Sequence, residues 1–167
     1  MKTLTSNCPP QLDCCDRQTL LNYFQEAWQL EDLLLKSLVG EDTFYLNPDP
    51  LRNPLIFYLG HSAAFYINKL MRVGLLEESL NQDYEILFGV GVDPATPTEL
   101  NQAIAHLEWP DVTSAWKYRE QVLEILSEFI EKTPITLPIL PDYPLWALIM
   151  GIEHQRIHIE TSSMLFR

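Results

Sequence analysis

The segment that most constrains the fold is residues 54–73, which carry apolar side chains on nearly every face of the helix they predict. Asn53 and Pro54 form a helix start signal, an N-cap residue followed by proline at the first helical position. Gly74 directly follows the pattern. A helix that is apolar all round must be covered on all sides, so we expect it at the centre of a helical protein.

Three further long helices are predicted to cover the central one. Residues 17–39 follow a plausible N-cap, Asp16, and carry an apolar stripe at helical spacing. Residues 113–132 carry a second stripe. Four prolines in residues 133–144 exclude helix and predict an extended crossover, after which a fourth helix begins.

The remaining segments are connections between these helices. Residues 41–53 form one connection, and residues 74–112 are long enough to hold short helices near 76–88 and 97–106. Residues 1–15 form an irregular leader. No strand pattern, internal repeat or interdomain linker is visible in the sequence. We therefore expect an all-α fold, a four-helix bundle with long connections, in a single domain spanning residues 1–167.

The fourth helix, which begins at Pro144 and Leu145, carries two histidines whose spacing would let them bind the same metal ion. His154 and His158 lie four residues apart, so a helix stacks their imidazoles one turn apart, about 6 Å between side-chain bases. Their stripe is otherwise small or apolar, so we expect them to point inward. Gln155 replaces the glutamate of the H-E-x-x-H zinc-protease motif. Taken alone, the pair fits a transition-metal site and two packed histidines equally well.

His61 is the candidate third ligand, on the central helix. It lies on one stripe with Phe57, Phe65, Asn68 and Arg72. A lone histidine in such a helix is usually a core residue, but helical bundles build metal sites from side chains on facing helices. Three histidines on one side of an ion suit zinc as a Lewis acid or ferrous iron in oxygen chemistry, and spacing alone does not choose between them.

Other polar residues have simpler interpretations. Glu31 interrupts the apolar stripe of the first helix, and we expect it to be partly exposed at an end of the bundle rather than functional. Glu153, Arg156 and Glu160 lie on another face of the fourth helix from the histidines, where they predict a salt-bridge ladder. His106 stands at the end of an element and is expected on the surface.

The net charge of −12 argues against binding to nucleic acid or to anionic lipid. No apolar run approaches the roughly 20 residues of a membrane span, and the N-terminus lacks the apolar core of a signal peptide. Cys8, Cys14 and Cys15 are odd in number, and two are adjacent, so they do not indicate a disulfide framework. We expect ordinary thiols and a cytoplasmic protein.

Several stretches together resemble a known family. They are residues 15–18, 20–24, Trp28, 54–61, 67–70, 89–93 and 153–161. In these stretches the chain is similar to the DinB-like metal-binding domain at the N-terminus of the ergothioneine and ovothiol sulfoxide synthases. The similarity looks closest to the ovothiol branch, 5-histidylcysteine sulfoxide synthase.

The resemblance implies that His61, His154 and His158 bind a non-haem ferrous iron, a site that zinc or nickel can also occupy in purified protein. In the family, the iron promotes oxidative carbon–sulfur coupling of cysteine to histidine, or to a methylated histidine, with molecular oxygen. The family's enzymes continue into a second domain similar to formylglycine-generating enzyme, whereas this sequence stops within an apolar helical pattern. We therefore expect a second catalytic domain or a second copy as partner, and small thiol and histidine substrates.

Three functions remain open at this point, and no catalytic residue is assigned beyond the ligands. The first is the iron-binding domain of a sulfoxide synthase that needs a partner domain for turnover. The second is a stand-alone, dimeric DinB-like metalloprotein with a thiol-handling or metal-dependent hydrolase role. The third is a structural bundle in which the histidines only pack.

Overall fold

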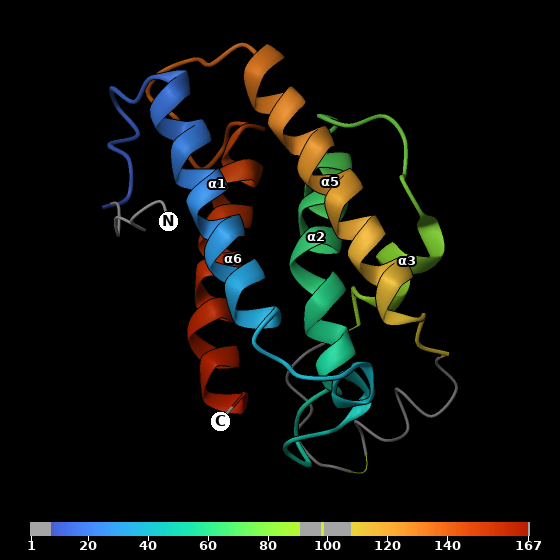
Figure 1. Cartoon of the computed structure of the whole chain (residues 1–167). Helices are drawn as coiled ribbons and strands as arrows, with labels where there is room; N and C mark the ends of the chain where they lie inside the picture. The colour runs from blue at the N-terminus through green and yellow to red at the C-terminus, as the bar shows by residue number, and fades with distance from the viewer. Residues whose placement is uncertain (1–7, 91–97, 99–107, 167) are drawn as a thin grey trace.

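The computed structural model describes residues 8–90, 98 and 108–166. Four long helices carry the fold: α1 (Arg17–Leu35), α2 (Leu55–Arg72), α5 (Val112–Lys132) and α6 (Trp146–Leu165). The short helices η1 (Glu41–Tyr45) and α3 (Gln82–Leu87) lie in the connections (Figure 1). These described residues contain no strand, which confirms the predicted all-α class. The helix expected near 97–106, together with His106, lies outside them.

The four long helices form a ring in the order α1, α5, α2, α6, since each packs against the next. Helices α1 and α6 run in one direction, and α2 and α5 run in the other (Figure 1). The consecutive helices α2 and α5 are therefore parallel neighbours, and the chain has to travel back along the bundle between them. This return explains why the connection is long, as the sequence predicted.

Helix α1 begins as predicted and ends early. The Asp16 side chain accepts the backbone N–H of Thr19 at 2.7 Å, the bond expected of an N-cap. The helix stops at Leu35, four residues before the predicted end at residue 39. Val39 is 88% exposed, so a longer helix would gain no burial there.

The predicted start of α2 is wrong in one detail. Pro54, rather than Asn53, occupies the cap position, and the amide atoms of Asn53 are buried without a hydrogen-bond partner. The N–H of Leu55 is satisfied by the carbonyl of Leu46 at 3.0 Å, so the preceding loop does the capping.

Two glycines allow other elements to approach α2 closely. A Cβ atom on Gly60 would lie 2.4 Å from the ring of Phe88, directly after α3. A Cβ atom on Gly151 of α6 would lie 2.3 Å from the ring of Tyr66 on α2. Both distances are far below a normal carbon–carbon contact. Alanine at either position would push α3 or α6 away from the central helix.

The connection at residues 133–144 is non-helical, as its four prolines predicted. Its Ile139 is buried and donates its N–H to the carbonyl of Leu12, which ties this connection to the N-terminal segment. Cys8, Cys14 and Cys15 are free thiols, the last one buried. None of the helices within the described ranges has the length and apolar character needed to cross a bilayer.

Candidate metal centre

Three of the four histidines meet between α2 and α6. The Nε2 atom of His158 lies 3.2 Å from Nε2 of His61 and 3.1 Å from Nε2 of His154. No other group of three potential metal-ligating side chains comes together in the described part of the chain. The sequence prediction that these three side chains converge is thus confirmed.

The histidines meet because α2 and α6 pack against each other in antiparallel orientation (Figure 1). Gly151 allows α6 to lie against Tyr66 of α2, one turn before the first histidine of the pair. From there His154 lies over Phe65, and His158 lies beside Tyr58 further back along α2. His61 sits between these two levels, so its ring meets both partners.

The backbone selects the nitrogen that His61 presents to the cluster. Its Nδ1 lies 2.7 Å from the carbonyl oxygen of Phe88, which can only accept a hydrogen bond. In the neutral imidazole, Nδ1 therefore carries the proton and Nε2 keeps its lone pair for a ligand. Aromatic stacking also holds the rings: His61 stacks on Phe57, and His154 lies parallel to Phe65 with ring centroids 3.6 Å apart.

The surroundings keep two of these imidazoles neutral. Burial, followed by the proximity of His158, lowers the pKa of His61 to about 4. Burial also lowers the pKa of His154 to about 3, with further contributions from the two other histidines and Lys69. Both rings are consequently neutral at pH 7, which is the form that binds metals.

Two of the three nitrogen–nitrogen distances fit bonds to a single metal ion, and one ring nitrogen from each histidine lies within 4.8 Å of those of the other two. Bonds of about 2.0–2.2 Å to one ion place two nitrogens 3.1–3.2 Å apart when the angle between the bonds is about 90–105°. That range lies at and below the tetrahedral angle. Three nitrogens on one side leave the other positions open, and no carboxylate from the described residues belongs to the cluster. The donor set suits zinc, iron or nickel better than magnesium or calcium.

Two cavities reach the cluster from the surface. An apolar one of about 530 Å³ is lined by Phe65, Trp146 and His154 among others. A more polar one of about 630 Å³ is lined by Asp49, Arg52, Tyr58, His154, Ile157, His158, Thr161, Met164 and Leu165. His154 and Ile157 line both cavities and so form the wall between them. The pair is therefore only half-buried and opens toward solvent, rather than pointing wholly inward as the sequence suggested.

Two residues predicted on the metal-facing stripe of α2 point elsewhere. Arg72 is exposed and lies 11 residues beyond His61, about 16 Å along the helix. Asn68 is exposed and donates to the backbone carbonyl of Glu85 at 2.9 Å. Among the described residues, the charged side chains that line the polar cavity with His154 and His158 are instead Asp49 and Arg52, which lie in a loop whose sequence has no periodicity to predict them.

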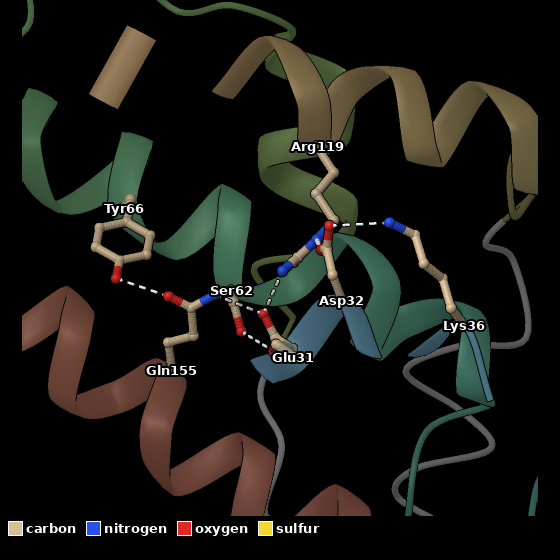
Figure 2. Close-up of polar contacts among 7 residues, drawn as sticks. All are labelled: Glu31, Asp32, Lys36, Ser62, Tyr66, Arg119 and Gln155. Atoms are coloured by element: carbon tan, nitrogen blue, oxygen red, sulfur yellow. Dashed lines mark hydrogen bonds and ion pairs between the residues drawn. The ribbon is translucent and has the colours of Figure 1, made fainter. Parts of the chain in front are cut away.

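Glu31 is buried, 4% exposed, and the expectation of a partly exposed side chain is wrong. Its carboxylate accepts hydrogen bonds from Ser62 Oγ at 2.6 Å and from Gln155 Nε2 at 2.8 Å. It also forms an ion pair with Arg119 at 2.7 Å. Figure 2 shows these contacts, which join α1 to the other three long helices and offset the cost of burying the charge.

The same network continues on both sides of Glu31. Arg119 is buried, pairs with Asp32 at 2.7 Å and lies over the ring of Trp28 at 4.3 Å. On the other side, the amide oxygen of Gln155 accepts the hydroxyl of Tyr66 at 2.9 Å (Figure 2). Gln155 stands between the two histidines of α6 in sequence, so these bonds help to fix the rotation of that helix about its axis.

The other charges of α6 reach across to α1 instead of forming the predicted ladder along one helix. Glu153 accepts the hydroxyl of Tyr23 at 2.7 Å. Arg156 forms an ion pair with Glu26 at 3.5 Å and lies over the ring of Tyr23 at 4.0 Å. Burial, together with the bond to Glu153, raises the pKa of Tyr23 to about 12. Glu160 is exposed.

Comparison with known proteins gives one informative similarity. No protein-family profile matches the chain. A protein of Neurospora crassa named Ergothioneine biosynthesis protein 1 is 28% identical over 144 residues, which cover 84% of this chain and 16% of that protein. Over most of its length, the chain is thus similar to a small part of a much longer protein, one whose name places it in ergothioneine biosynthesis.

Proposed function

We propose that His61, His154 and His158 bind one divalent transition metal, ferrous iron in the native protein, and that the chain is the iron-binding domain of a sulfoxide synthase. The observation that carries the proposal is the meeting of three Nε2 atoms, 3.1 and 3.2 Å apart, between α2 and α6. Similarity to an ergothioneine biosynthesis protein supports the reaction class. In purified protein, zinc or nickel can fill the same site.

The proposed reaction couples cysteine to histidine, or to a methylated histidine, with molecular oxygen. Bound ferrous iron would supply the oxygen chemistry. The chain's own contribution is to keep His61 and His154 neutral, to direct the His61 lone pair at the cluster, and to leave one side of the cluster open to two cavities. The finer assignments to the DinB-like fold and to the ovothiol branch, with 5-histidylcysteine as product, belong to this proposal.

We also propose a cytoplasmic protein that works with a second domain or with a second copy of itself. The matched part is 16% of the relative's length, so the relative contains much protein outside the matched segment. Free thiols at Cys8, Cys14 and Cys15 suit a reducing compartment.

Metal analysis tests the proposal directly. The chain is loaded with ferrous ion under anaerobic conditions, desalted and analysed, and we expect about one iron per chain. No retained iron, and no retained zinc after the same procedure, would favour the structural bundle in which the histidines only pack. A metalloprotein that retains metal but hydrolyses esters or handles thiols without oxygen would support the stand-alone alternative.

A further inference from the structure

The polar cavity beside the histidines receives two opposite charges from one tight turn. The backbone N–H of Arg52 donates to the carbonyl of Asp49 at 2.9 Å, which closes a four-residue turn. The Asp49 carboxylate accepts the N–H of Leu51 at 2.8 Å, a bond that holds the turn from within. Both side chains are half-buried and line the cavity that contains His154 and His158.

The other described residues that line this cavity carry no carboxylate, ammonium or guanidinium group. Asp49 and Arg52 are the only acidic and basic side chains among the described lining residues. Ile157, Met164 and Leu165 supply an apolar wall of the cavity. The described lining thus combines one positive charge, one negative charge, apolar side chains and the imidazoles of His154 and His158.

This combination matches the chemistry of a free α-amino acid. A guanidinium can bind a carboxylate through two parallel hydrogen bonds, and a carboxylate can accept the N–H groups of a primary ammonium. In an α-amino acid, these two groups sit on one carbon atom, as Asp49 and Arg52 sit on one turn. The volume of about 630 Å³ is ample for such a molecule and typical of small-molecule sites.

We propose that this cavity binds the amino-acid end of a substrate, with Arg52 holding the α-carboxylate and Asp49 holding the α-ammonium. The substrate's side chain then extends along the apolar wall toward His154 and His158. The assignment rests on the proposed function, which supplies free amino acids as substrates. Cysteine and histidine share the recognised groups, and the experiment distinguishes them.

The test compares each amino acid with its decarboxylated analogue on the zinc-loaded full chain, because zinc prevents oxidative turnover. Calorimetric titrations are made with L-histidine and histamine, and with L-cysteine and cysteamine. Arg52→Gln removes a charge-assisted hydrogen bond to the carboxylate and should therefore lower the affinity for the amino acid roughly 10- to 100-fold. The analogue, which lacks the carboxylate, should bind wild type and variant alike. The amino acid that shows this loss is the occupant.

Asp49→Asn tests recognition of the α-ammonium group in the same way, with imidazolepropionate as the histidine analogue that lacks the amino group. Arg52→Lys keeps the charge without the paired donors and should give an intermediate loss. Arg72→Gln removes an exposed arginine of α2 and should change nothing. These comparisons separate recognition of the amino-acid end from a general effect of charge.

The proposal would be overturned if wild type bound each amino acid and its decarboxylated analogue with equal affinity. It would also be overturned if Arg52→Gln lowered the affinity for the amino acid and for its analogue equally. Binding of neither amino acid would overturn it as well. Zinc content is measured before and after each titration. Zinc retained by wild type and variants, with no discrimination between ligands, contradicts this inference alone. Failure of the wild type to hold zinc or iron contradicts the proposed function itself.

Discussion

His158 occupies the central place in the cluster, because its Nε2 contacts the Nε2 of both other histidines. Its removal leaves two nitrogens on different helices without the ligand that lies between them. The hydrogen bond from His61 to the Phe88 carbonyl cannot compensate, since it orients a ligand but adds none.

We predict that His158→Ala abolishes tight metal binding and that His106→Ala does not. The variants are loaded with ferrous ion or zinc and desalted, and metal per chain is measured against wild type. A far-ultraviolet circular dichroism spectrum confirms that each variant keeps its helices. Equal metal loss in both variants would show that the ligand set is wrong.

The pH dependence of the metal-free protein follows from the lowered pKa values of His61 and His154, about 4 and about 3. In the unfolded chain these groups titrate near about 6.5, so acid adds protons to the unfolded state first. The contribution of the two buried, neutral histidines to the free energy of unfolding is complete above about pH 6.5. It is lost as the pH falls through 4 toward 3.

The expected result is a melting temperature that declines between about pH 6.5 and 4, with a shallower decline in His154→Gln. Thermal unfolding of both proteins without metal, at half-unit steps of pH, measures the difference. Carboxylates titrate alike in the two proteins and cancel in the comparison. Parallel curves for wild type and variant would contradict the pKa shift of His154.

For individual residues, the sequence was informative where functional side chains recur at helical spacing. The spacing of His154 and His158, with one more histidine on a central helix, was enough to predict the cluster. Glu31 was recognisable as an exception in its stripe, but its partner Arg119 lies 88 residues away on another helix. Asp49 and Arg52 reach the site through a turn whose position depends on packing, and no periodicity encodes that.

Among the elements, α6 has the least obvious amphipathic pattern and depends on polar contacts to set its rotation. Gln155 is held by Glu31 of α1 and Tyr66 of α2, and Glu31 is held in turn by Arg119 of α5. The helix carrying two histidines is therefore oriented directly by its ring neighbours α1 and α2, and by α5 through the ion pair of Arg119 with Glu31.

We predict that Arg119→Met lowers the free energy of unfolding by roughly 3–5 kcal/mol, because it leaves Glu31 buried without its counter-ion. Lys36→Met is the matched control: Lys36 also pairs with Asp32, at 3.3 Å, but it is exposed, and its loss should cost about 0.5 kcal/mol or less. Urea unfolding measures both. Similar small losses in the two variants would mean that the buried ion pair contributes little.

Most helix bounds were predictable because burial and local sequence agreed. Helix α5 was predicted at residues 113–132 and lies at Val112–Lys132. The end of α1 and the cap of α2 were missed, since there tertiary contacts decide: the exposure of Val39 in one case, the carbonyl of Leu46 in the other. The ring order was not predictable from stripes alone, because a stripe shows that a helix face is buried without identifying its neighbour.

For the whole molecule, we predict metal binding with little or no sulfoxide-synthase turnover by this chain alone. The centre is open on one side, and a single pair of charges, Asp49 and Arg52, can anchor only one amino-acid substrate. The apolar cavity offers the second substrate no Lys or Arg among its described residues, and its one carboxylate, Glu153, already accepts the hydroxyl of Tyr23. Orientation of both reactants is worth several kcal/mol of the barrier, about 7–11 in favourable cases, so its absence should reduce the rate by orders of magnitude.

Oxygen consumption by iron-loaded protein with cysteine and histidine measures this activity, with product detection by mass spectrometry. Metal-free protein serves as the control for uncatalysed thiol oxidation. Coupled product formed at ordinary enzyme rates, roughly 1 per second or more, would show that this chain is a complete enzyme.

The distance along the chain between the ligands also sets an order of events during protein synthesis. His61 and His158 are 97 residues apart, and α6 is made after the other three long helices described. At roughly 5–20 residues per second, the ribosome adds the final ligand about 5–20 s after the first. During most of that interval the growing chain contains one of the three clustered imidazoles, that of His61, which is already bonded through Nδ1 if the Phe88 carbonyl is in place. If the cluster binds metal as proposed, the complete set of three nitrogens becomes available only after α6 has packed against α2.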